Sequence, residues 1–157
     1  MGSVRLMLKT VLPSVIAITM LAGCAGTAPD DDAAIGRWQA RQAAATKDDG
    51  DLLGVLSGRV GAAESGNTED VAGRVRMKFE SPTELRSVTL WCFGHGTVRG
   101  YLSIDEGPTS RSEGVDVRCG AKPRTLRLSQ TWRTGVQGVG FSAVAASNDS
   151  AWQLTIR

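Results

Sequence analysis

Hydrophobic and polar positions divide the chain into three stretches with different patterns. Residues 10–22 form an apolar run that carries no charge. Residues 25–51 are rich in Ala, Asp, Gly and Thr and show no sustained periodicity. From Leu52 onward, apolar residues recur at every second position, which is typical of half-buried β-strands. The pattern therefore predicts a leader, a polar linker and a strand-rich body.

The strand-rich body spans residues 52–157. Alternation is cleanest in residues 74–80 (RVRMKFE), where polar and apolar side chains follow one another without a fault. The same period predicts further strands in residues 52–60, 87–92, 97–105, 115–119, 125–129, 139–145 and 152–156. Clusters of Gly, Asn, Asp, Ser and Pro separate these runs. Seven or eight short strands with such breaks predict an all-β fold, an antiparallel β-sandwich or a barrel.

Residues 24–51 are expected to form a flexible linker, because their composition is that of a solvated stalk. Within the linker, residues 33–45 are compatible with a short helix that has Asp31 or Asp32 as its N-cap. Alanines and two larger apolar residues are the only hydrophobic content of this stretch, so the helix is expected to be marginal. We expect Trp38 to face solvent, and contact with the membrane interface or with the body is the alternative.

The first residues have the composition of an export signal. Arg5 and Lys9 precede an uncharged run of thirteen residues, 10–22. That run is shorter than the roughly 20 residues that a membrane-spanning helix needs. A positive segment, a short apolar segment and small residues after it indicate a secretory signal peptide. A buried helix or a short membrane helix is the alternative.

The end of this leader, Leu21-Ala22-Gly23-Cys24, resembles the lipobox of bacterial lipoproteins. The resemblance covers residues 1–24. It implies that residues 1–23 are removed, that the Cys24 sulfur carries a diacylglyceryl group and that the membrane is a partner through this anchor. Two acyl chains anchor a protein stably where one does not. The expected location is the extracytoplasmic face of the cell membrane.

The body resembles small envelope lipoproteins of high-GC Gram-positive bacteria. Fourteen arginines against four lysines, with abundant Ala and Gly, fit a GC-rich genome. In a cell with two membranes, Ala25 after the lipidated cysteine would favour the outer membrane, by analogy with lipoprotein sorting.

The cysteine count is odd, and the lipobox resemblance accounts for one of the three cysteines. Cys92 and Cys119 remain, and in an oxidising compartment we expect them to form a disulfide. A metal pair or two free thiols are the alternatives. Both cysteines follow the apolar phase of their strands. In a simple meander the two cysteines would lie about 9.6 Å apart, too far for a disulfide, so either the chain crosses between sheets or the Cys119 strand pairs next to the Cys92 strand. A bridge between two sheets, as in immunoglobulin-like sandwiches, is the arrangement that we expect.

Charge argues against a nucleic-acid partner. Two of the 18 basic residues lie in the leader, which leaves 16 against 16 acidic residues in the remaining chain. A nucleic-acid-binding domain has a concentrated excess of basic residues. The segment 24–51 holds six acids and three bases, and residues 52–157 hold ten and thirteen.

Five residues are candidates for ligand binding. Arg74, Arg76 and Lys78 share the outward phase of one predicted strand, which suits anionic lipid headgroups or an acidic envelope polymer. Trp91 and Trp132 are candidate exposed aromatics that stack on a sugar or a peptide. The alternative is that these arginines and the lysine are the ordinary polar face of a soluble strand.

No catalytic, metal or cofactor motif stands out. His95 lies between two glycines and indicates a turn, and no G-x-S-x-G sequence supplies a serine nucleophile. Gly135, Gly138 and Gly140 lack the following helix that a nucleotide site requires, so turns and bulges explain them better. We therefore expect no enzyme, but a lipid-anchored, non-catalytic binding or interaction module of the envelope, with a glycan or protein partner. An envelope hydrolase that uses loop carboxylates or His95, and a structural spacer, are the alternatives.

The anchoring prediction depends on a single sulfur atom. Replacing it in Cys24→Ser is expected to remove the mass of the acyl groups and to shift the protein out of the detergent-rich phase. Intact-mass spectrometry and detergent phase partitioning measure both effects. A variant that keeps its partitioning and loses no fatty-acid mass contradicts the lipoprotein assignment.

Overall fold

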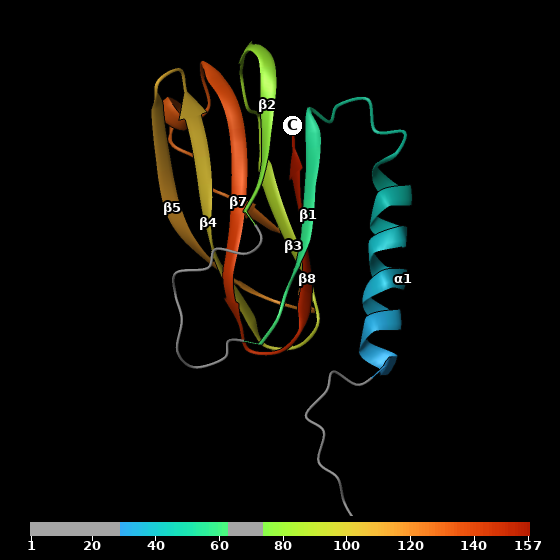
Figure 1. The fold of residues 1–157 in the computed structure, drawn as a ribbon. Coiled ribbons are helices and arrows are strands. Elements are labelled where there is room, and N and C mark those ends of the chain that lie inside the picture. Colours follow the sequence, from blue (N-terminus) through green and yellow to red (C-terminus); the bar gives the residue numbers. More distant parts are fainter. Residues whose placement is uncertain (1–28, 63–73) are drawn as a thin grey trace, which may run out of the picture.

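The computed structural model describes residues 29–62 and 74–157, which form one helix and two four-stranded antiparallel sheets (Figure 1). The helix α1 spans Pro29–Thr46. The strands are β1 (Gly54–Val60), β2 (Arg74–Thr83), β3 (Val88–Phe93), β4 (Thr97–Glu106), β5 (Thr109–Arg118), β6 (Arg124–Leu126), β7 (Val136–Ala146) and β8 (Ser150–Ile156), with a short 3-10 helix, η1 (Gln130–Trp132). The predicted all-β sandwich is confirmed.

The two sheets pack face to face. One has the strand order β1-β8-β3-β6 and the other β2-β7-β4-β5, and all neighbouring strands within them are antiparallel. The alternating apolar residues of both sheets meet in the core, where Leu90, Leu102 and Ile104 are fully buried. Phe141 and Trp152 meet edge to face, with ring centroids 4.8 Å apart, and so join the two sheets at the centre.

A disulfide joins the sheets at one end. Cys92 lies in β3 of one sheet, and Cys119 directly follows β5 of the other. Their sulfur atoms are bonded and their Cα atoms are 4.7 Å apart, so the predicted inter-sheet bridge is confirmed. Closing a loop of this length stabilises a folded chain by about 3.5 kcal/mol in the chain-entropy model.

The helix α1 is longer than predicted and begins earlier, at Pro29. Proline suits the first helical position because the amide hydrogen that it lacks has no partner there. Three aspartates follow in the first turn, where the helix dipole favours negative charge. Asp31 and Asp32 lie inside the helix, so the prediction that one of them is the N-cap is wrong. Asp32 forms an ion pair with Arg59 of β1, at 2.8 Å.

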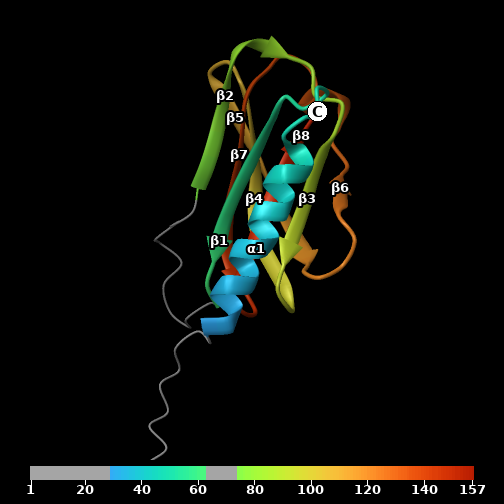
Figure 2. The ribbon, with the colours of Figure 1, turned by 90° about the vertical axis from the view of Figure 1, so that its right-hand side faces the viewer.

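The helix lies along the outer face of the β1-β8-β3-β6 sheet, as Figure 2 shows. Ile35 and Trp38 pack on Ala151 of β8, with Trp91 and Phe93 of β3 beside them. The Trp38 ring stacks on Phe93 at 5.8 Å between centroids, and Trp38 is only 8% exposed.

This packing differs from the expected flexible linker. Trp38 is buried rather than solvent-facing, because odd-numbered positions of β3 and β8 offer an apolar patch that the local pattern of the linker does not reveal. Residues 29–46 therefore belong to the folded body. The leader, Cys24 and the residues up to 28 lie outside the described residues. No helix within 29–62 and 74–157 is long and apolar enough to cross a membrane.

Arg157 contacts the segment that joins α1 to β1. Arg157 donates a hydrogen bond to Asp49 at 2.6 Å, and the pair is partly shielded from solvent. The hydrogen bond from Arg157, with a second one from the Asp51 backbone, lowers the pKa of the Asp49 carboxyl below its ordinary value of 3.8. We call this contact the Asp49–Arg157 pair.

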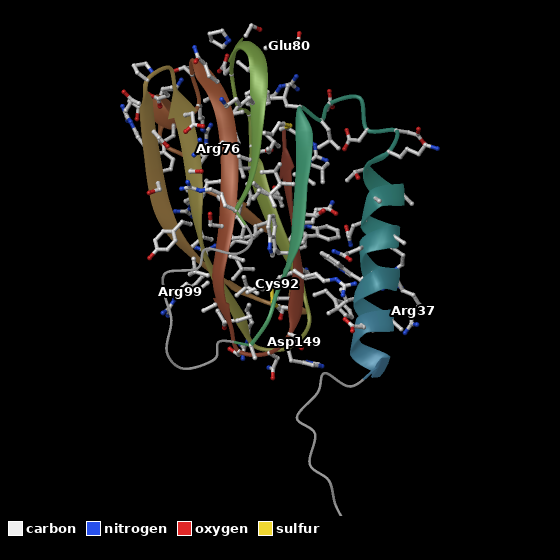
Figure 3. The ribbon with its side chains drawn as sticks, in the orientation of Figure 1. Arg37, Arg76, Glu80, Cys92, Arg99 and Asp149 are labelled. Carbon is white, nitrogen blue, oxygen red and sulfur yellow. A yellow bond between two sulfur atoms is a disulfide. The ribbon has the colours of Figure 1, made fainter. Side chains whose placement is uncertain are left out.

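Helix packing is tested by Trp38→Ala. Removing this buried indole is expected to lower the free energy of unfolding by about 3 kcal/mol. Urea denaturation measures the change. Arg37→Ala, which alters the exposed neighbour on the same helix (Figure 3), is the matched control and should change stability by less than about 0.5 kcal/mol. Equal effects of the two substitutions would contradict the docked helix.

The Asp49–Arg157 pair predicts a dependence of stability on pH. Because the pKa of Asp49 is lowered on folding, its stabilising contribution is present above pH 3.8 and is lost as the pH falls through the lowered value. Asp49→Asn is therefore expected to be less stable than the wild type at neutral pH. The difference in stability is expected to shrink as the pH falls through the lowered pKa of Asp49. Urea midpoints of both proteins across the acidic range measure it. A difference that stays constant into strong acid contradicts the pair.

Candidate binding face

The two sheets differ in what covers their outer faces. The β1-β8-β3-β6 sheet, here called the covered sheet, has the core on one side and α1 on the other. The β2-β7-β4-β5 sheet, here called the open sheet, lies on the side of the sandwich away from α1 (Figure 1). Its outer face meets solvent, and Arg76 and Arg99 project from it (Figure 3). This face is the candidate site.

Strand register places the predicted basic residues of β2 in rows with outward residues of β7 and β4. Arg74 is opposite Ser142, and Ser142 is opposite Tyr101. The two rows that follow are Arg76–Gly140–Ser103 and Lys78–Gly138–Asp105. Arg99 and Arg118 lie on the same side, on β4 and β5. We call the outward surface of Arg74, Arg76, Lys78, Arg99 and Arg118 the basic face.

Two glycines of β7 shape the middle of the basic face. A side chain at Gly140 would come within 2.6 Å of the Ser103 hydroxyl, and one at Gly138 within 2.9 Å of an Asp105 carboxylate oxygen. Glycine is therefore needed because neighbouring side chains lie directly over the β7 backbone. The space allows the Arg76 side chain to reach across β7 to Asp105, 3.5 Å away. Gly140 lies inside a regularly paired stretch, so the expected explanation by turns and bulges is wrong for it, whereas Gly138 adjoins the register shift between β2 and β7.

Positive charge exceeds negative charge on the basic face. Five bases share it with two acids, which leaves an excess of three. Asp105 pairs with Arg76, and Asp116 pairs with Arg99 at 3.0 Å. Arg74, Lys78 and Arg118 form no ion pair with an acid in the described part of the chain. Glu80 is the next outward residue of β2. It is not counted with the basic face, because the pairing of β2 with β7 becomes irregular after Lys78.

A polar pocket of about 310 Å³ lies at one end of the basic face. Arg76, Lys78 and Asp105 line one side of it, and the β4–β5 turn with Pro108 and Ser110 lines the other. Two cationic side chains beside hydroxyl groups are suited to an anionic oxygen group, which accepts hydrogen bonds from both.

The predicted aromatics do not join the basic residues. Trp91 faces the opposite side of the molecule, next to α1, and Trp132 lies in η1 and packs against the core. The aromatic residue on the basic face is Tyr101, which is half exposed and shares a row with Arg74. Sequence reasoning missed it, although its alternation with Leu102 placed it outward in the predicted strand.

The remaining candidates do not assemble into a catalytic site. His95 is exposed in the β3–β4 turn, between Gly94 and Gly96, whose φ angles are +119° and +87°. Asp105 and Glu106 are consecutive in β4 and so point to opposite sides, where Glu106 pairs with Arg111. The acidic residues in segment 63–73 lie outside the described residues.

Comparison with known proteins gives no further assignment, since no protein-family model, curated protein or solved structure matches the chain. The candidate site therefore rests on the geometry of the open sheet alone.

Proposed function

We propose that the protein is a lipid-anchored module of the cell envelope that binds a linear anionic polymer on its basic face without chemical catalysis. The observation that carries the proposal is the row of Arg74, Arg76 and Lys78 on alternate positions of β2, all on the outer face of the open sheet. A linear polymer with repeated acidic groups is the partner that such a row matches.

The spacing of the charges supports a linear partner. Alternate residues of a strand lie about 6.7 Å apart, so the three cations of β2 form a straight row about 13 Å long. Arg74 and Lys78 have no acidic partner in the described residues, whereas Arg76 is held in place by Asp105. One oriented cation between two unpaired ones favours binding of a polymer that bears several regularly spaced charges.

Tyr101 and the serines support recognition of a polymer that contains sugar or polyol units. The Tyr101 ring is exposed on the same face, two strands away from the row of cations and next to Gly114 of β5, and it offers a flat surface for stacking. Ser110 and Ser112 of β5 are exposed on the same face and offer hydroxyl groups for hydrogen bonds.

The proposed anchor places this face near the membrane. Cys24 precedes Pro29 by five residues, so its Cα atom lies within about 18 Å of the start of α1 whatever path the chain takes. The basic face lies on the layer opposite to α1 (Figure 1). A lipid on Cys24 therefore keeps the body within reach of polymers at the membrane surface.

Charge reversal tests the proposal. The full chain in detergent is measured by surface plasmon resonance against dextran sulfate, a linear polyanion, and against neutral dextran. The wild type is expected to bind only dextran sulfate, with an affinity that falls as salt rises. The double substitution Arg74→Glu with Lys78→Glu is expected to weaken binding by about tenfold or more.

The matched control reverses one arginine and one lysine elsewhere. Arg127 and Lys122 are exposed and lie outside the basic face, so Arg127→Glu with Lys122→Glu changes the net charge equally. This control is expected to bind within about twofold of the wild type. Equal losses in both double variants would show that net charge alone attracts the polymer, and the proposed face would be wrong. Binding to anionic vesicles but not to dextran sulfate would also overturn it.

A further inference from the structure

A second pocket lies at the end of the sandwich where α1 begins, and it is unrelated to the basic face. Its volume is about 640 Å³, within the range of roughly 300–1,000 Å³ that is usual for small-molecule sites. Ala34 and Ile35 of α1 form one wall, Phe93 of β3 forms another, and Ala62 lies after β1. Apolar atoms make up most of this lining. We call it the helix-end pocket.

The mouth of the helix-end pocket is polar and is held by hydrogen bonds. The Asn148 side chain donates to the His95 carbonyl at 3.2 Å, which joins the β7–β8 and β3–β4 turns. The Ala62 backbone amide donates to the Asp149 carboxylate at 2.9 Å. Gly94 and Gly120 also line the pocket. An apolar interior with a fixed polar rim is suited to an amphiphile whose hydrocarbon part enters first.

The position of the pocket relative to Cys24 identifies the occupant. Ala34 is five residues into α1 from Pro29, which is about 7.5 Å along the helix axis. Cys24 is five residues before Pro29, within about 18 Å of it. The Cα atom of Cys24 therefore lies at most about 26 Å from Ala34, whereas it can lie up to about 43 Å from Thr46 at the other end of α1.

We propose that one acyl chain of the lipid on Cys24 occupies the helix-end pocket. This inference rests on the proposed lipid anchor, and it does not depend on polymer binding. Because methylene groups that contact the apolar lining are removed from water, the pocket offsets part of the cost of taking an acyl chain out of the bilayer. The short tether then gives the attached chain an effective concentration at the pocket that free lipids do not have.

Occupation of the pocket has two consequences. The body is held at a fixed orientation, with the α1 end toward the membrane, because the lipid contacts both α1 and the β3–β4 turn. It also leaves fewer acyl chains in the bilayer, and a single chain binds a membrane only reversibly. The pocket thereby sets how firmly the protein is retained.

Photocrosslinking in the intact membrane tests the proposal with the full chain. Bacteria that express the protein are fed a fatty acid with a terminal diazirine, so that lipid on Cys24 carries the photoreactive group. After irradiation, mass spectrometry of peptides is expected to find the Cys24 peptide joined to peptides that contain Ala34, Phe93 or Asn148. The unirradiated protein shows first whether Cys24 carries lipid.

A matched pair of substitutions places a carboxylate on α1 inside or outside the pocket. Ala34→Asp puts the charge on the apolar wall and is expected to reduce the intramolecular crosslink by about tenfold. Ala44→Asp makes the same change at an exposed position near the other end of α1 and should leave the yield unchanged. Equal yields in these two variants would overturn the proposal.

The remaining outcomes are distinct. A lipidated wild type whose label reacts only with membrane lipids shows an empty pocket and overturns this inference while the anchor stands. Label that reaches the pocket in Cys24→Ser shows that a free lipid is the occupant, which also overturns it. A wild type without lipid on Cys24 removes the occupant and the proposed anchor together.

Discussion

A β-strand places successive side chains on opposite sides, and this constraint governs which residues form the core, the seat of α1 and the basic face. Two stacked sheets have four faces, of which the core uses only two. The third, on the covered sheet, carries Trp91, Phe93 and Ala151, and α1 packs over it, so that Ala151 is buried and the two aromatic residues are partly buried. The fourth, on the open sheet, is covered by no helix of the described residues and carries charged, hydroxyl and glycine residues instead. The location of the basic face therefore follows from the face on which the helix lies.

The open sheet shows how a binding surface arises from strand pairing. β7 is central and contributes small residues, so the side chains of its neighbours β2 and β4 approach each other across it. Arg76 and Asp105 meet in this way although 29 positions separate them in the chain. Larger residues at Gly138 or Gly140 would push these side chains apart. The charge pattern of the face thus depends on two residues that carry no charge.

Much of the fold follows from local signals in the sequence. The alternation in residues 74–80 and 87–92 fixes which side chains of β2 and β3 face inward, since it needs only neighbouring positions. The inward phase of Cys92 and Cys119, combined with the reach of a disulfide, excluded a simple meander and favoured a bridge between sheets over pairing of the two strands in one sheet. Alternation along a single strand can be recognised in the sequence without knowledge of the strand order.

The remaining features depend on contacts between distant segments. Ile35 and Trp38 are too few to mark a helix as buried, and only the patch on β3 and β8 explains their burial. The proximity of Tyr101 to Arg74 depends on β7 lying between their strands, which no local pattern encodes. The helix-end pocket is formed by one helix, a strand end and several turns. The basic residues of β2 were predicted, but their neighbours were not.

The path of α1 has a mechanical consequence. The chain enters at Pro29 at one end of the sandwich, and α1 joins β1 at the other end (Figure 1). Tension applied through the preceding residues therefore peels the helix from the sheet turn by turn before it reaches a strand. Eighteen residues lengthen from about 27 Å as a helix to about 60 Å when stretched. The disulfide-bonded sandwich stays folded while α1 unfolds, so α1 lengthens under tension before any strand is pulled out.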